Sequence, residues 1–210
     1  MTFKQLLNKY GPQPPSIVSR LLLDDIHLVP SAKVRSFVDK YCTYLEDNLM
    51  AGKMHNATYV ERVQSLLEIL PERMKEPLLE RAFIFFDNAY MQKKMSAQLY
   101  FRDVILLAKN LQGNERKIRA DSIWKDLEHA FAKKDLRVGS LLNFMIATSA
   151  IYQGADRDKA FTEVLQRAQS FNSDKKLALR KASHYAYLIA RNADSAEVLQ
   201  AAHNFGLALT

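Results

Sequence analysis

Turn-forming residues are scarce in this chain, and their scarcity limits the folds that it can adopt. Six glycines and six prolines are spread over 210 residues, which is about half the usual content of these two residues. A sandwich or barrel of many short strands needs more turn residues than this. No proline follows Pro77, so the rest of the chain lacks the residue that most strongly interrupts helices.

Apolar residues recur with the period of an α-helix from about residue 31 to the end. One early face illustrates the pattern, with spacing i, i+3, i+4, i+7 and i+11: Val34, Phe37, Val38, Tyr41 and Leu45. The strongest β-like run, residues 82–86, lies inside another such helical pattern. Short connectors leave consecutive helices antiparallel. We therefore predict an all-α fold of antiparallel helical hairpins stacked as a short α-solenoid.

Two prolines delimit one of the predicted helices. Pro71 ends the apolar stripe before it, and we expect Pro77 in the first turn of the next helix. Proline is tolerated in a first turn because the N–H that it lacks would have no helical partner there.

The first 30 residues differ from the rest of the chain. They contain the proline-rich segment 11–15, and their first acidic residue is Asp24. We predict that residues 1–30 form an N-terminal docking arm with short helices and a Pro-rich linker, and that residues 31–210 form a single helical-repeat domain. A plain pair of short helices joined by the linker is the alternative. The acid-free start and a pI near 9.4 favour the mitochondrial matrix over the cytoplasm as an intracellular location.

An internal similarity near the C-terminus indicates a repeat. Residues 163–171 and 197–205 are identical at six of nine positions, at an offset of 34 in the numbering, and a weaker third copy ends at Phe131. In this interpretation Phe131, Phe171 and Phe205 form the repeat core. The alternative is the ordinary similarity between amphipathic helices rich in Val, Leu, Ala and Phe.

With this repeat, the chain over residues 114–210, and loosely the helices before it, resembles the tetratricopeptide and pentatricopeptide class of helical-hairpin repeats. The resemblance implies stacked hairpins that bury a continuous core between neighbours. The Trp…Leu-Gly…Tyr signature of tetratricopeptide repeats is absent, and no unit fits the base-reading positions of pentatricopeptide repeats. The resemblance therefore indicates architecture and leaves the ligand open.

Residue patterns that carry catalysis are missing from the sequence. The nearest two of the five histidines are His184 and His203, so no His-x-x-x-His metal site exists on one helix. The six glycines are scattered singly, which leaves no phosphate-binding loop. The acidic series from Glu68 to Glu80 is expected to be solvated, and Cys42 is expected to be buried, as are His129 and His203 beside repeat aromatics. We predict no enzyme activity, cofactor, metal, small-molecule substrate or membrane insertion.

Basic residues exceed acidic ones by seven, and several of them cluster near helix ends. Arg137 falls in the same turn as one cluster. The candidate contacts to RNA or to an acidic partner are Arg116, Lys117, Arg119, Lys133, Lys134, Lys175, Lys176, Arg180 and Lys181. Alternatively, these residues are ordinary solvated positions on helix faces. In an RNA-binding protein, Tyr152, Tyr185 or Tyr187 would stack on unpaired bases.

These features predict a non-enzymatic helical-repeat interaction protein, a structural subunit or adaptor of a larger assembly that binds one or more protein partners. The alternative function is RNA binding by a helical-repeat protein, which the basic pI and the lysine and arginine clusters favour. A third alternative is a helical enzyme whose site is assembled from dispersed residues.

Overall fold

The computed structural model describes residues 1–207 and is all-helical over that range, with no β-strand. This confirms the predicted fold class at the level of all-α. Two short 3₁₀ turns, Asp25–Leu28 and Ser31–Lys33, precede the third α-helix. The α-helices are α1 (Phe3–Tyr10), α2 (Pro15–Asp24), α3 (Val34–Met50), α4 (Asn56–Ile69), α5 (Glu72–Met91), α6 (Ala97–Ala108), α7 (Gly113–Ala132), α8 (Val138–Ser149), α9 (Gly154–Ser173), α10 (Leu179–Asn192) and α11 (Ala196–Leu207).

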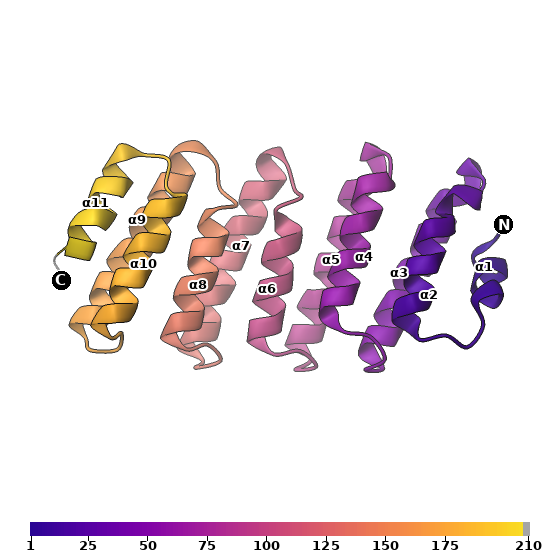
Figure 1. Ribbon diagram of the computed structural model, residues 1–210, viewed down its shortest axis with the longest axis horizontal. Helices are drawn as coiled ribbons and strands as arrows, with labels where there is room; N and C mark the ends of the chain where they lie inside the picture. The colour runs from indigo at the N-terminus through magenta and orange to yellow at the C-terminus, as the bar shows by residue number, and fades with distance from the viewer. Residues whose placement is uncertain (208–210) are drawn as a thin grey trace. The chain divides into compact units, whose positions relative to one another are not determined.

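The chain forms two compact units, Met1–Ser96 and Ala97–Thr210. Within each unit, neighbouring helices in the sequence pack against each other (Figure 1). The boundary predicted at residue 30 falls inside the first unit, where α1 and α2 both contact α3. A docking role for residues 1–30 stays a prediction. The last three residues of the predicted domain 31–210 lie outside the described residues.

The first unit buries its N-terminal helices as well as α3 to α5. Leu6 of α1 and Leu22 of α2 have no exposed surface. The buried Tyr41 of α3 donates a hydrogen bond from its hydroxyl to the Ser19 carbonyl oxygen of α2, at 2.9 Å. Arg62 of α4 donates from Nε to the Ser19 hydroxyl at 3.3 Å. Three helices are thus joined through one buried serine.

The second unit is built from α6 to α11, each packed on the next in sequence. Contacts also join α6 to α8, α8 to α10, and α9 to α11. In these three pairs, helices that are two apart in the chain contact each other, in addition to the contacts between successive helices. Because every helix has several partners, each buries apolar residues on more than one side.

Helix starts recur at a constant interval along the chain. Helices α4, α6, α8 and α10 begin at residues 56, 97, 138 and 179, and α5, α7 and α9 begin at residues 72, 113 and 154, so each start lies 41 positions after the one before. Buried positions follow the same interval. Exposure is at most 1% at each member of two such sets: Leu45, Phe86, Leu127 and Ala168, and Val63, Val104, Met145 and Ala186.

The turns that end α3, α5, α7 and α9 share one backbone conformation. Each contains a residue with positive φ, and these residues are spaced at the same interval: Gly52 (φ 69°), Lys93 (φ 56°), Lys134 (φ 65°) and Lys175 (φ 60°). The next N–H in each turn bonds to a carbonyl five residues back, as from Asp135 to Ala130 at 2.9 Å. This pattern closes helix ends when one residue is left-handed. We call these four segments the left-handed turns.

The interval of 41 residues between helix starts differs from the offset of 34 that the internal sequence similarity predicts. At the structural interval, Phe205 of α11 is equivalent to Val164 of α9, whereas Phe171 lies in the last turn of α9. Phe171 and Phe205 are buried, and Phe131 is half-buried, with its ring edge-on to that of Phe171 at 5.5 Å. The three phenylalanines are therefore not at equivalent positions when the chain is aligned at the interval between helix starts.

Pro77 lies within α5 and not in its first turn, so that prediction is wrong. The helix begins at Glu72, directly after Pro71. Because proline has no N–H, the carbonyl of Arg73 loses its helical partner. Arg73 is exposed, so water can satisfy that carbonyl and the helix continues through Pro77.

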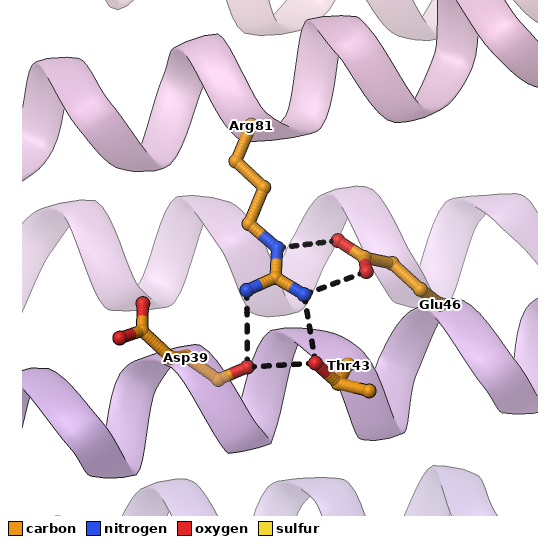
Figure 2. A network of polar contacts seen from close by, with 4 residues as sticks. All are labelled: Asp39, Thr43, Glu46 and Arg81. Carbon is orange, nitrogen blue, oxygen red and sulfur yellow. Dashed lines mark hydrogen bonds and ion pairs between the residues drawn. The ribbon is translucent and has the colours of Figure 1, made fainter.

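An arginine of α5 connects α5 to α3 in the first unit (Figure 2). The guanidinium of Arg81 donates two hydrogen bonds to the Glu46 carboxylate, both at 2.7 Å. It also donates to the Thr43 hydroxyl at 2.9 Å and to the Asp39 carbonyl oxygen at 3.1 Å. The Glu46 carboxylate raises the pKa of Arg81 above its ordinary value. Bidentate pairs of this kind fix orientation as well as adding stability.

Replacing Lys134 by glycine is expected to stabilise the protein by about 1 kcal/mol, because lysine at φ 65° suffers a contact between its Cβ and the backbone that glycine avoids. The measurement is urea unfolding followed by circular dichroism. The matched control is Lys133→Gly, at φ −77°, which is expected to lower stability. Equal effects of the two substitutions would contradict the left-handed assignment.

Replacing Arg81 by methionine is expected to destabilise the protein by about 2 kcal/mol, because it removes charge-assisted hydrogen bonds. It also leaves the Glu46 carboxylate, whose side chain is 18% exposed, without its arginine. Urea unfolding measures the change, and Arg73→Met on the exposed side of the same helix is the control, expected to change stability by under about 0.5 kcal/mol. A loss no larger than that of the control would show that this network does not stabilise the unit.

Candidate binding site

Lysines gather on the left-handed turns. The α7–α8 turn carries Lys133 and Lys134 followed by Arg137, and the α9–α10 turn carries Lys175 and Lys176. All five side chains are exposed. Each turn also contains a carboxylate, Asp135 or Asp174. The Asp174 carboxylate lies 3.2 Å from the ammonium of Lys176, but both side chains are at least half exposed, so water screens this pair.

A groove of about 680 Å³ lies between these two turns in the second unit. We call it the cationic groove. Within the described chain, the residues that line it include four cations and no carboxylate. The full set of lining residues is Phe131, Leu136, Arg137, Val138, Gly139, Lys175, Lys176, Leu177, Ala178 and Lys181. Leu136 and Leu177 are buried with 4% exposure each, so an apolar floor lies beneath the charged side chains.

Two helices begin at the cationic groove. Helix α8 starts at Val138 and α10 at Leu179, and the residues before them, Arg137 and Ala178, form no side-chain hydrogen bond to either helix start. The first backbone N–H groups of an α-helix have no partner within the helix. Together with the helix dipole they favour a negative charge nearby. Both helix starts therefore add to the positive potential of the lysines and Arg137.

Contact between α10 and α8 sets the position of these helix starts. The hydroxyl of Tyr185 in α10 donates a hydrogen bond to the Gly139 carbonyl oxygen in α8, at 3.0 Å. A Cβ added at Gly139 would lie 3.2 Å from the same hydroxyl oxygen. A glycine at this position therefore allows the close approach of the two helices beside the groove.

The structure brings together only some of the predicted basic residues. Lys175, Lys176 and Lys181 line the cationic groove, while Lys133, Lys134 and Arg180 lie in the adjoining turns and the first turn of α10 without lining it. The other three candidates, Arg116, Lys117 and Arg119, lie in the first turns of α7. The two ends of a 20-residue helix are about 30 Å apart, so these three residues belong to a different surface.

Sequence reasoning placed Arg137 beside a basic cluster without naming it as a candidate contact, and it did not identify the apolar floor. A signal for them exists, because a Lys-Lys pair or a single lysine precedes each of four equally spaced apolar residues, Met54, Met95, Leu136 and Leu177. Aligning the chain with itself at that interval would have matched the four apolar residues to one another and the lysines before them to one another.

A second hollow, of about 370 Å³, lies near the start of α7 and has a different character. Its charges compensate one another. Lys117 pairs with Asp156 at 2.6 Å, and the Tyr152 hydroxyl donates to the Asp121 carboxylate at 2.8 Å. Burial and this carboxylate raise the pKa of Tyr152 above its ordinary value. Because each of these two acids has a partner, this hollow does not attract ions of one sign.

The tyrosines considered as stacking platforms differ in exposure. Tyr152 and Tyr185 are buried, at 9% and 5% exposure, and both hydroxyls are engaged in the hydrogen bonds described above. Tyr187 is 61% exposed on α10. Only Tyr187 of these three rings has an open face to offer a base.

Other candidate chemistry has the following positions. Among residues 1–207, no three His, Cys, Asp or Glu side chains gather as a metal-binding group. His129 and His203 are exposed, so their predicted packing role is wrong.

Cys42 is buried at 1% exposure, as predicted, and burial raises the pKa of its thiol to about 12. No helix within the described residues has both the length and the apolar content needed to cross a bilayer.

Comparison with known proteins returns no match for this chain, whether against protein-family models, curated proteins or solved structures.

Cys42 is expected to resist thiol reagents in the folded protein. Burial keeps the thiol protonated and inaccessible, whereas the reactive form is the exposed thiolate. Ellman's reagent at neutral pH should react slowly with the native chain and fully in urea. The single cysteine makes the reading unambiguous, and fast stoichiometric reaction without denaturant would contradict its burial. Above the ordinary thiol pKa of about 9, only the unfolded chain loses this proton, so stability should fall as the pH rises further.

Proposed function

We propose that this chain is a non-enzymatic helical-repeat protein that binds a protein partner as a structural subunit or adaptor of a larger assembly. In this proposal, the helices of each unit are antiparallel hairpins stacked as an α-solenoid. The observation that carries the proposal is the constant interval of helix starts, left-handed turns and buried positions. A tetratricopeptide unit has a shorter repeat, of about 34 residues.

The physical basis of the proposal is the way in which repeats bury surface. One helix pair cannot cover its own apolar face, so neighbours stack and leave equivalent turns in rows along the edges. Such rows present side chains at regular spacing, which suits recognition of an extended partner segment. The contacts of α6 with α8, α8 with α10, and α9 with α11 support this stacking in the second unit.

RNA binding is the second candidate function, and the cationic groove is the observation that favours it. Non-specific contacts to phosphates need exposed cations, which the two turns supply. Recognition of single-stranded RNA also uses aromatic rings with open faces. Burial of Tyr152 and Tyr185 removes two of the three candidate rings, so protein binding is the better supported function. Location in the mitochondrial matrix remains a prediction from the composition of the first residues.

Purification of the tagged full-length chain at native expression level, with and without RNase, tests this proposal. We expect one or a few proteins in constant ratio to the chain, retained after RNase treatment and at raised salt, because well-packed protein interfaces depend weakly on salt. The chain carrying the same tag but unfolded by substitution of Leu127 with aspartate is the control for binding to the tag. Recovery of RNA, with loss of the proteins after RNase, would replace this function by RNA binding.

A further inference from the structure

We propose that the cationic groove binds an acidic, leucine-containing peptide segment of the protein partner. This inference rests on the proposed function, because it specifies the chemistry of the partner at one surface. Carboxylates of the segment would lie at the starts of α8 and α10, and an aliphatic side chain would lie on the floor formed by Leu136 and Leu177.

Charge complementarity is the first argument. Arg137, Lys175, Lys176 and Lys181 line the groove without an opposing carboxylate among the lining residues of the described chain. Asp174 lies 3.2 Å from Lys176 at the surface, and an ammonium group has three donors, so this lysine can still bind a second carboxylate. The uncapped starts of α8 and α10 add two further positive ends of helix dipoles on the same side.

The backbone of Lys175 provides a second argument. Its φ of 60° is left-handed, and the equivalent residue in the α3–α4 turn is Gly52, which adopts φ 69° without strain. A lysine therefore occupies a position where glycine would give a more stable turn. Lys93 and Lys134 share this conformation without lining the groove, so Lys175 is the strained lysine whose side chain is also at the groove.

The apolar part of the groove favours a peptide over RNA. The aromatic ring among its lining residues, Phe131, lies edge-on to Phe171 at 5.5 Å and is half-buried. Because the ring is half-buried and packs on Phe171, only part of it is left to stack on a base. Leu136 and Leu177 are themselves buried, and the half-buried Val138 and the exposed Ala178 line the groove with them. These two side chains leave apolar area that an aliphatic side chain can cover, and burial of that area stabilises the contact.

Fluorescence anisotropy with the full-length chain tests this inference directly. The probe is a short fluorescein-labelled peptide of glutamate, aspartate and leucine. The comparison probes are the same peptide with glutamine and asparagine in place of the acids, a glutamate-only peptide of equal charge, and a single-stranded oligouridylate of similar length. We expect binding of the acidic leucine peptide, weaker binding of the glutamate-only peptide, and the weakest binding of the amide peptide.

Substitutions in the groove should weaken that binding selectively. The pair Lys175→Gln and Lys176→Gln is expected to reduce affinity about tenfold or more, since close charge pairs at interfaces couple strongly. The control pair, Lys117→Gln and Lys159→Gln, removes the same charge near the starts of α7 and α9 and should change affinity less than about twofold. Lys175→Gly should raise the midpoint of thermal unfolding while lowering affinity, which separates loss of binding from loss of folding.

Three outcomes would overturn the inference. They are no binding of the acidic leucine peptide, equal weakening by the groove pair and the control pair, or tighter binding of the oligouridylate that the groove pair abolishes. The proposed function is judged separately. If the purified chain and the Lys175→Gln, Lys176→Gln variant retain the same protein partners after RNase, the chain remains a partner-binding protein and only the groove assignment fails.

Discussion

Within each unit, the left-handed turns set where the helices that follow them begin. Each one ends an odd-numbered helix by returning an N–H to a carbonyl five residues back, as Lys176 does to Phe171 at 2.8 Å. Within each unit, this backbone bond fixes the direction in which the next helix starts, as for α4, α8 and α10. Since Lys93, Lys134 and Lys175 are equally spaced along the chain, the following helices α6, α8 and α10 begin at the same interval. Buried positions on those helices then fall into equivalent places.

The same turns concentrate charge. A turn held by backbone hydrogen bonds leaves its side chains in solvent, so lysines can occupy it without desolvation. In the second unit, two such turns lie on either side of one groove, and the helices that leave them present their N-termini to it. A positive potential arises there from two sources: the charges of the side chains, and the unpartnered N–H groups at the starts of α8 and α10, which are the positive ends of their dipoles. The C-terminal carbonyls of α7 and α9, in the same turns, oppose it in part.

The sequence was sufficient to predict an all-helical fold, because helical periodicity and scarce glycine and proline act locally. The constant interval between helix starts could not be predicted in the same way. Residues at equivalent buried positions, such as Tyr41, Ala82, Ile123 and Val164, share only their apolar character. The local identity between residues 163–171 and 197–205 pointed instead to a shorter offset. The positions along the chain of the left-handed residues and of the helix starts, which only the structure gives, show the longer interval.

For the candidate site, the sequence located the lysines but not their grouping. Lys117 and Lys175 look alike in the sequence, yet the first pairs with Asp156 and the second lines the groove. Which cations share a surface depends on which turns are neighbours in space, and helix packing decides that. The burial of Cys42 was predictable from its apolar helix face, whereas the exposure of His129 was not, because one residue of rotation about a helix changes its side.

Backbone bonding in the left-handed turns has a consequence for chemical modification. Acetylation of Lys175 would remove its positive charge and leave the backbone hydrogen bonds of the turn in place, because they do not use side chains. The charge on such a turn can therefore change without a change in the conformation of its backbone. A surface built in this way can change its electrostatic character, residue by residue, while the helices around it keep their positions.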